Sequence, residues 1–258
     1  LAGRSEVTPE NNTFELEYGV DSLTITVTLN AGYELDYTYP ENASNEISVS
    51  GNTITISNMA ADRELVISGT PRENTLTLNM TNSSVSQVTG GTQGDGVITS
   101  LTGQTVSITF APSKGYSFVQ GQSTISLSGR GNIETTYQDG NVTVVWSGFT
   151  GDASLTVSPT PNANTITFGD NSSRVASIWA NSQSVNVAGG SVSVRTGESL
   201  TIVVNLRYGY HNASLTLQEG STASVSPQEE TFDDETKTYR RTFVVSGIDE
   251  NLQITITS

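Results

Sequence analysis

The chain has a single histidine, His211, and it is the first residue to consider for catalysis. A serine hydrolase needs a nucleophile, a histidine base and a third group that orients the base. Nothing in the sequence marks such a third group, and His211 directly follows Tyr210 in a segment that has counterparts elsewhere in the chain. We therefore interpret His211 as a turn residue and predict that the chain is not an enzyme.

Two acidic pairs, Glu229-Glu230 and Asp233-Asp234, are of the residue type that glycoside hydrolysis uses. That reaction needs one carboxyl group as an acid and another as a base or nucleophile. Both pairs lie in the run SPQEETFDDETKTYRR, which is polar throughout. Such a run is typical of a solvated hairpin loop, so we predict no catalytic residue there.

Several aspartates lie in glycine-rich turns, where oxygen ligands for calcium can gather. They are Asp95, Asp139, Asp152 and Asp170. None belongs to a D-x-D-x-D-G loop, and Asp-Gly turns form without a metal. The chain also has no cysteine, so it has neither a disulfide nor a thiolate metal site. We assign no metal and no cofactor.

Trp179 is the main candidate for a binding residue. It lies in RVASIWANSQ with Arg174 and Asn181, and the corresponding stretch VSQVTGG has no tryptophan. An aromatic face can stack on a sugar ring, but aromatic side chains are also enriched at protein interfaces. We take these three residues as a candidate ligand or interface contact. We predict that Trp179 packs at a domain or subunit contact and that the chain binds no glycan.

The charge balance argues against a nucleic-acid partner, and the lack of long apolar runs argues against membrane insertion. With 26 acidic and 11 basic residues, the formal net charge is −15. A nucleic-acid-binding protein needs a basic face that contacts phosphates, so we predict no nucleic-acid partner. No apolar run approaches the roughly 18 residues that a membrane-spanning helix requires, so we predict no membrane insertion. A strongly acidic chain stays soluble and repels copies of itself.

The elements that position these residues follow from a repeated pattern. Before each of three Gly-Tyr pairs, apolar residues alternate with Thr, Ser or Asn, as in a strand with one buried face. Counted back from Tyr33, Tyr116 and Tyr210, the residue ten positions earlier is Leu23, Val106 and Leu200. We predict that the three tyrosines are core residues at equivalent sites. Trp146 aligns with Ile56 and Val245, and we place it in the core too.

The repeats define three units, at 1–71, 72–161 and 162–258. Thr70-Pro71 and Thr160-Pro161 stand 90 residues apart, each directly before a new unit. Unit one is shorter ahead of its tyrosine, so it lacks a hairpin, has a shorter loop, or has its missing part upstream of residue 1. Proline at the hand-over points stiffens short joints, which favours a semi-rigid rod.

No stretch of the chain carries a helical period. Val, Ile and Thr dominate, and turn signals recur every ~8–12 residues, which indicates a β-sandwich or barrel. We predict an all-β protein of three tandem immunoglobulin-like β-sandwich modules.

The strand ending in Gly-Tyr-x-Phe or Gly-Tyr-x-Leu, followed by a closing segment such as ELVISGTP, resembles known tandem surface repeats. These are the internalin-type B repeats and the related repeats of bacterial surface proteins and phage structural proteins. Internalin-type repeats have a Gly-Trp soon after Gly-Tyr and a β-grasp fold with a short helix. Neither is visible here, so the immunoglobulin-like sandwich is preferred and β-grasp is the alternative.

The resemblance implies an extracellular location, on a bacterial cell surface or a phage virion. It also implies a non-catalytic structural role as a spacer, decoration or fibre segment, with other protein subunits of the assembly as partners. The alternative function is an adhesion module that binds host glycans or a receptor. A concave aromatic patch around Trp179 would distinguish the second function from the first.

Overall fold

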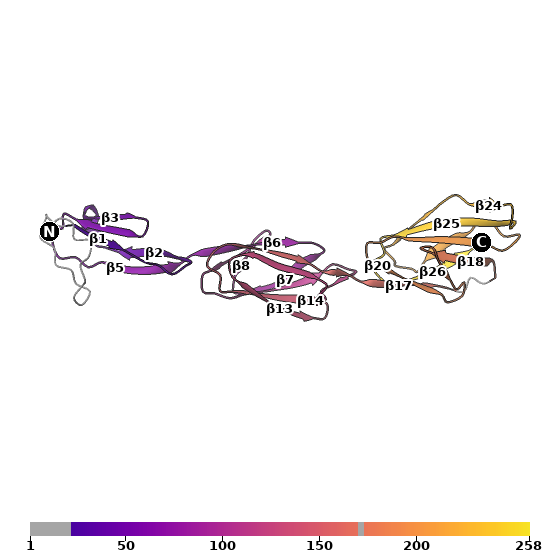
Figure 1. Ribbon diagram of the computed structural model, residues 1–258, viewed down its shortest axis with the longest axis horizontal. Coiled ribbons are helices and arrows are strands. Elements are labelled where there is room, and N and C mark those ends of the chain that lie inside the picture. Colours follow the sequence, from indigo (N-terminus) through magenta and orange to yellow (C-terminus); the bar gives the residue numbers. More distant parts are fainter. Residues whose placement is uncertain (1–21, 170–172) are drawn as a thin grey trace.

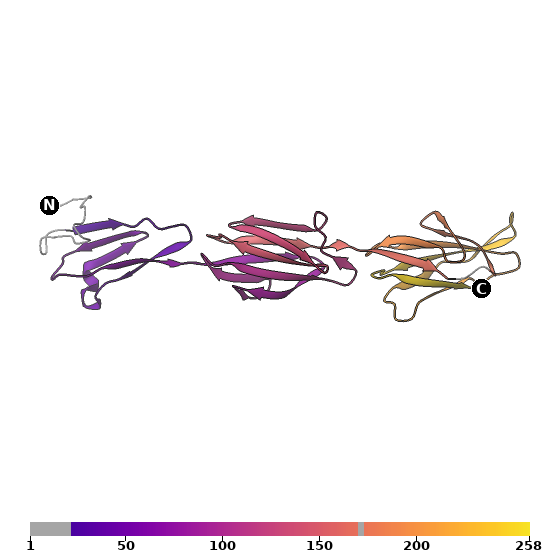
Figure 2. The same ribbon diagram turned by 90° about the horizontal axis from the view of Figure 1, so that it is seen from below.

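A computed structural model describes residues 22–169 and 173–258, and this part of the chain is all-β. Its only helix is the short 3-10 helix η1 (Glu41–Glu46). Figures 1 and 2 show three groups of strands that follow one another along the long axis in both views. We keep the names unit one, unit two and unit three for the repeat ranges. No strand pairing among the described residues crosses from one range to another.

Unit one is described from residue 22 onward and has two small antiparallel sheets. One has the order β1-β4-β3, and the other pairs β2 with β5. The strands are β1 (Ser22–Thr26), β2 (Tyr33–Thr38), β3 (Ile47–Ser50), β4 (Thr53–Ser57) and β5 (Val66–Pro71). The predicted absence of a hairpin concerns residues 1–21, which lie outside the described residues.

Unit two has two facing sheets and a short third pair. The sheet orders are β13-β14-β10-β7 and β12-β15-β6-β9-β8, and β11 pairs with β16. The strands are β6 (Glu73–Met80), β7 (Ser83–Thr89), β8 (Thr92–Gln93), β9 (Val97–Leu101), β10 (Val106–Pro112), β11 (Tyr116–Ser117), β12 (Thr124–Gly129), β13 (Asn132–Gln138), β14 (Asn141–Ser147), β15 (Ala153–Ser158) and β16 (Thr160–Pro161). The first long strand, β6, runs parallel to β15, and the other pairs are antiparallel.

Unit three repeats this topology. Its sheet orders are β19-β18-β21-β25-β23, with β24 also on β25, and β20-β17-β26-β22. The strands are β17 (Ala163–Phe168), β18 (Val175–Ala180), β19 (Gln183–Val185), β20 (Ser191–Arg195), β21 (Leu200–Leu206), β22 (Ser214–Leu217), β23 (Ser224–Pro227), β24 (Thr231–Asp233), β25 (Thr238–Ser246) and β26 (Leu252–Thr257). Again the first and last strands, β17 and β26, are parallel. The described residues of units two and three include no helix of the kind that a β-grasp fold requires.

The core of each of these two units lies between its sheets. One cluster of buried apolar residues is drawn entirely from 76–157, and the other entirely from 166–256. The alternating residues read from the sequence form the inward face of the central strand. Each residue ten positions before a tyrosine lies directly opposite the residue aligned with Trp146. The three pairs are Leu23 with Ile56, Val106 with Trp146, and Leu200 with Val245.

Trp146 is fully buried and anchors the core of unit two. Its ring stacks on Phe149, with the ring centroids 3.8 Å apart, and its Nε1–H donates to the carbonyl of Arg130 at 3.0 Å. The backbone beside it leaves no room for a side chain, because a Cβ on Gly131 would lie 2.5 Å from Nε1. The indole therefore has both its apolar face and its polar atom satisfied.

The prediction that the three tyrosines are core residues is wrong. Tyr33 and Tyr116 are only partly buried, and Tyr210 keeps 40% of its surface exposed. The alternating, buried part of each strand ends before the Gly-Tyr turn, so the tyrosine lies at the end of its unit rather than between the sheets. The hydroxyl groups of Tyr33 and Tyr116 lie near Gly103 and Gly197 of the next unit, which the repeat pattern alone does not place.

We predict that Trp146→Ala unfolds unit two at lower denaturant while unit three keeps its transition. Truncation of a large buried aromatic side chain costs about 3–5 kcal/mol, because it removes apolar contacts and leaves a cavity. Chemical denaturation followed by amide hydrogen exchange would separate the two units. Tyr208→Ala is the control, since Tyr208 is 79% exposed. Equal destabilisation of both units by Trp146→Ala would contradict independent cores.

Candidate functional site

The residues considered for catalysis from the sequence make hydrogen bonds or ring contacts that hold loops and turns. Glu230 accepts the backbone N–H groups of Asn212 and Ala213, at 2.9 and 3.0 Å, and so holds the segment that follows His211. Asp233 accepts the backbone N–H groups of the turn between β24 and β25, and these hydrogen bonds lower the pKa of its carboxyl group. The His211 ring is exposed and lies edge-on to Tyr239. Loop and turn geometry accounts for each of these groups.

The described residues contain neither a cluster of metal-ligating side chains nor a membrane-spanning helix. Residues 22–169 and 173–258 contain no group of three or more His, Cys, Asp or Glu side chains that could hold a metal ion. Asp152, one of the four turn aspartates, accepts the backbone N–H of Thr75 at 2.8 Å, while Asp170 lies outside the described residues. Within the same residues, no helix is long and apolar enough to cross a membrane.

Glu46 is the one buried carboxylate among the described residues of unit one, with 4% of its surface exposed. The guanidinium of Arg63 donates to both of its oxygens at 3.0 Å, and Tyr39 and the backbone N–H of Ala60 donate as well. The hydrogen bonds from Arg63 are the main reason that the pKa of Glu46 is lowered. A carboxylate satisfied on all sides ties the segment before β3 to the loop after β4 and has no capacity left for a ligand.

Asn162, the first residue of unit three, links that unit to unit two through its main-chain groups. Its backbone N–H donates to the carbonyl of Gly115 in unit two at 2.8 Å. Its own carbonyl accepts the N–H of Thr196 in unit three at 2.9 Å. Just before it, Thr160–Pro161 forms the short strand β16, which pairs with β11 of unit two. We call this set of contacts joint two.

Gly115 is the tightest point of joint two. It has φ +82°, and a Cβ at this position would lie 2.7 and 2.8 Å from the side-chain atoms of Thr196 and 3.0 Å from Asp249 Cβ. The neighbouring Tyr116 hydroxyl lies over Gly197, 3.7 Å from the position that a Cβ there would occupy. Only glycine combines the left-handed backbone with this close approach.

Joint one, between units one and two, has the same geometry. Arg72 replaces Asn162: its N–H donates to the carbonyl of Gly32, and its carbonyl accepts the N–H of Thr102, both at 2.9 Å. Gly32 has φ +84°, and a Cβ there would lie 2.6 Å from Thr102 Oγ1. The Tyr33 hydroxyl lies over Gly103 at 3.7 Å, as Tyr116 does over Gly197. The two joints thus share the same main-chain hydrogen bonds and the same contact between a glycine and a threonine.

In each joint, a buried asparagine hydrogen-bonds to the threonine that contacts the glycine. Asn74 donates to Thr102 Oγ1 at 2.9 Å, and Asn164 donates to Thr196 Oγ1 at 3.0 Å. All four residues are buried, so each amide–hydroxyl pair satisfies polar groups that would otherwise be costly to bury. The threonine that meets the glycine is therefore held in place by the first strand of its own unit.

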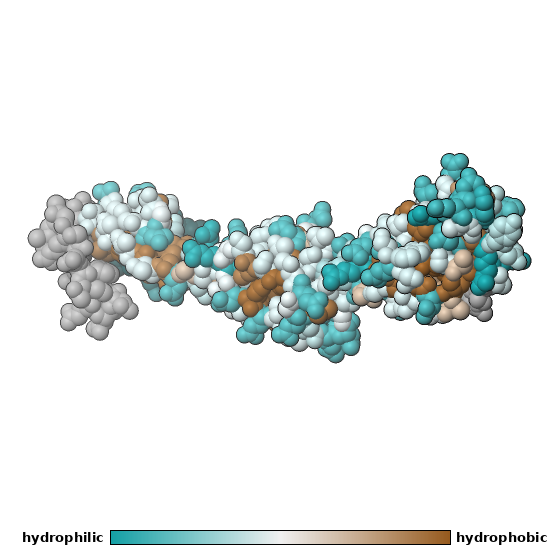
Figure 3. All heavy atoms as spheres, turned by 45° about the vertical axis from the view of Figure 1, so that its right-hand side comes forward, coloured by the Kyte–Doolittle hydropathy of each residue, from teal (hydrophilic) through white to brown (hydrophobic). Residues whose placement is uncertain are grey.

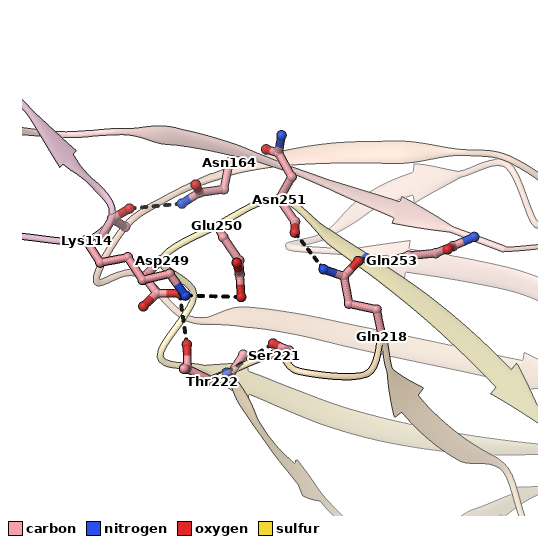
Figure 4. Close-up of polar contacts among 11 residues, drawn as sticks. Lys114, Asn164, Gln218, Ser221, Thr222, Asp249, Glu250, Asn251 and Gln253 are labelled. Atoms are coloured by element: carbon pink, nitrogen blue, oxygen red, sulfur yellow. Dashed lines mark hydrogen bonds and ion pairs between the residues drawn. The ribbon is translucent and has the colours of Figure 1, made fainter. Parts of the chain in front are cut away.

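The two joints differ in their charged contacts. In joint two, Lys114 Nζ lies 3.1 Å from Asp249 Oδ1 and 3.2 Å from Glu250 Oε1, so it reaches from unit two to a loop of unit three, as Figure 4 shows. The hydrogen bond with Asp249 raises the pKa of Lys114. Burial by itself would raise the pKa of Asp249, but hydrogen bonds from Thr222 and Lys114 outweigh it and lower that pKa. Joint one has an exposed pair instead, Arg72 with Glu34.

Trp179 lies in neither joint. It is on the outer face of β18, 43% exposed, and pairs across the sheet with Val203. It borders an open hollow of about 650 Å³ whose lining comes from unit three alone. The lining residues are Trp179, Asn181, Ser182, Thr201, Val203, Asn205 and Arg240. The prediction that Trp179 packs at a contact between units is therefore wrong, and a subunit contact stays a prediction.

Asn181 reaches this hollow because of a tight turn. Asn181 and Ser182 both have positive φ, so they form the two-residue connection between β18 and β19. The Asn181 side chain accepts the backbone N–H of Thr201 at 2.9 Å, which fixes the turn against the neighbouring strand β21. Asn181 thus has a structural role as well as a place beside Trp179.

Arg174 does not join Trp179. Its guanidinium lies 5.7 Å from the ring centre of Tyr210 and donates to the main-chain oxygen of Ser258. The arginine at the hollow is Arg240 of β25, which sequence reasoning missed. Its cross-strand partner is Asn205, and Trp179 pairs with Val203 two residues earlier on the same strand. The strand register, rather than nearness in sequence, brings the two together.

The corresponding face of unit two carries polar residues where unit three has Trp179. The residue at the position of Trp179 is Gln87, because Gln87 pairs with Thr109 as Trp179 pairs with Val203. A smaller hollow there is lined only by polar residues, Thr109, Thr136, Gln138, Asp139, Asn141 and Thr143. On the face drawn in Figure 3, hydrophobic residues reach the surface in separate small patches rather than as one continuous stripe.

Comparison with protein-family models, curated proteins and solved structures finds no match to this chain. The resemblance to bacterial and phage surface repeats therefore remains a hypothesis that rests on the sequence motifs.

We predict that joint two loosens in acid. The folded-state pKa of Asp249 lies below its ordinary value of 3.8, so its contribution is present above that value and is lost as the pH falls through the lowered pKa. Lys114 acts in the opposite sense: its contribution is lost only as the pH rises through its raised pKa, above 10.5. The joint should be tightest between these limits.

Distances between spin labels in units two and three would measure this, because the chain has no native cysteine to interfere. The distance distribution should broaden below about pH 4, near the ordinary pKa of an aspartate. Lys114→Gln should already be broad at neutral pH and change less on acidification. A wild-type distribution that is unaffected by acid would show that the backbone contacts alone hold the joint.

Proposed function

We propose that this chain is a non-catalytic structural protein, a rod segment that holds other parts of an assembly at a fixed separation. The observation that carries the proposal is the repeated joint. Two units meet through a single linker residue whose N–H and C=O are both bonded, one to each side. A spacer requires this kind of joint, whereas a flexible tether requires a linker with unpaired, solvated backbone.

The topology supports immunoglobulin-like modules as the finer description of the fold. Units two and three have two facing sheets, mainly antiparallel pairing and a first strand that runs parallel to the last. Their cores are separate. We therefore propose three tandem modules with hand-over points at Thr70-Pro71 and Thr160-Pro161.

For the setting, we propose a bacterial cell surface or a phage virion, with other protein subunits as partners. The motif resemblance supports this setting, and the net charge of −15 is in keeping with a protein that must stay soluble and avoid self-association. The absence of cysteine is compatible with a protein exported by a bacterium or carried on a virion.

Small-angle X-ray scattering of the wild-type chain tests the rod. We expect an extended, stiff particle whose maximum dimension persists at high salt, where charge repulsion is screened. Replacing both Gly32 and Gly115 by alanine should shorten the maximum dimension, because each Cβ would collide with a threonine of the next unit.

Gly209→Ala is the matched control. Gly209 has φ +83°, so alanine there suffers the same backbone strain of about 1 kcal/mol, but nothing lies within 4 Å of its Cβ position. The control should keep the wild-type dimension. A wild-type chain that contracts at high salt, or a double variant that stays fully extended, would contradict the proposed spacer.

The exposed Trp179 favours a second candidate function, carbohydrate binding on the outer face of unit three. A sugar presents an apolar face to an aromatic ring and needs its hydroxyls paired when they leave water. The hollow supplies both: Trp179 provides the ring, and Asn205 and Arg240 lie on the adjoining strands of the same sheet.

A glycan array separates the two candidates. The spacer proposal expects no specific binding by the wild-type chain. Carbohydrate binding would appear as signals that Trp179→Ala and Arg240→Ala both abolish. Phe232→Ala should keep such signals, since Phe232 is exposed to a similar degree, at 48%, but lies outside the hollow. Binding with this pattern would replace the spacer as the main function.

A further inference from the structure

The third Gly-Tyr turn has the geometry of the two that form joints. In each turn the tyrosine N–H donates to the carbonyl three residues earlier: Tyr33 to Asn30, Tyr116 to Ser113 and Tyr210 to Arg207, at 3.2, 3.0 and 3.1 Å. The glycine angles also agree, with φ of +84°, +82° and +83°. The turn of unit three is therefore already in the shape that receives a neighbour.

The contacts that the first two turns make are missing at the third. Within the described residues, nothing lies within 4 Å of a Cβ built on Gly209, and no N–H donates to its carbonyl. Tyr210 is not part of a strand, whereas Tyr33 and Tyr116 both pair with a Thr-Pro segment. Tyr208, at the position of Lys114, is 79% exposed.

The C-terminal end of β26 lies beside the Gly209-Tyr210 turn. In unit two, β15 runs through Ser158, opposite Thr124, and reaches Thr160–Pro161 two residues later. In unit three, Thr257 lies opposite Ser214 in the same way, so Ser258 takes the place of Pro159. Arg174 contacts both the Ser258 main-chain oxygen and the Tyr210 ring, which places that end beside the turn.

We propose that the Gly209-Tyr210 turn is a docking surface for a further repeat unit of the same kind, joined through Ser258. The incoming unit would pair a Thr-Pro segment with Tyr210, bond its linker N–H to the Gly209 carbonyl, and place a threonine of a Thr-Gly turn against Gly209. This inference rests on the joint geometry and holds whether the rod serves as a spacer or as a carrier of the Trp179 surface.

The test appends a copy of residues 160–258 directly after Ser258, which keeps the register of joint two. Cysteines replace Ser226 in unit three and in the appended copy, and spin labels on them report the distance between the two units. A second pair of spin labels, at Thr136 in unit two and Ser226 in unit three, spans joint two and serves as the reference. We expect the new distance distribution to be no wider than the reference.

In the extended chain, Gly209→Ala should broaden the new distribution and leave the reference distribution unchanged. Gly220→Ala is the control for backbone strain, since Gly220 also has φ +83° with nothing within 4 Å of its Cβ position. A broad distribution that Gly209→Ala does not alter would overturn the proposal. Concentration-dependent association of the unextended chain that Gly209→Ala abolishes would also overturn it, in favour of a second copy as the occupant.

Discussion

The arrangement of this molecule depends on two glycines that have no side chain where one unit meets the next. Gly32 and Gly115 each adopt a left-handed backbone that turns the chain end toward the following unit, and each leaves the space that a threonine side chain then fills. A Cβ at either position would lie closer than 3.0 Å to that threonine. The close approach also brings the glycine carbonyl within hydrogen-bond distance of the linker.

The hydrogen bonds that the two joints share are made by main-chain groups, whereas the charged side-chain contacts differ between the joints. Arg72 and Asn162 have little in common as side chains, yet their main-chain groups make the same two hydrogen bonds. The charged contacts vary instead: an exposed pair of Arg72 with Glu34 at joint one, and Lys114 with two acidic residues at joint two. Both joints share the glycine, the threonine with its buried asparagine, the tyrosine and a bonded linker residue, whereas the charged side chains beside them differ.

The units also differ in the residues on their outer faces. The inward positions of the central strands are apolar in all three units, since each must fill a core. The outward position occupied by Gln87 in unit two holds Trp179 in unit three, where it borders a hollow with Arg240. A repeated scaffold can thus carry an exposed aromatic residue beside a hollow on one unit without a change in the joints.

The sequence by itself determined the alternating strand before each Gly-Tyr pair, the repeat and the core position of Trp146. Alternation and turn chemistry are local, so they placed Trp146 in the core, where it is fully buried. That Trp146 lies opposite Val106 is known only from the strand register of the structure. Only the tertiary structure decided where the tyrosines and arginines lie. The Tyr116 hydroxyl lies near Gly197 of a different unit, and strand register brings Arg240 and Trp179 to the same hollow. Contacts between residues far apart in the chain depend on how strands pair and units meet, and a local pattern carries no information about either.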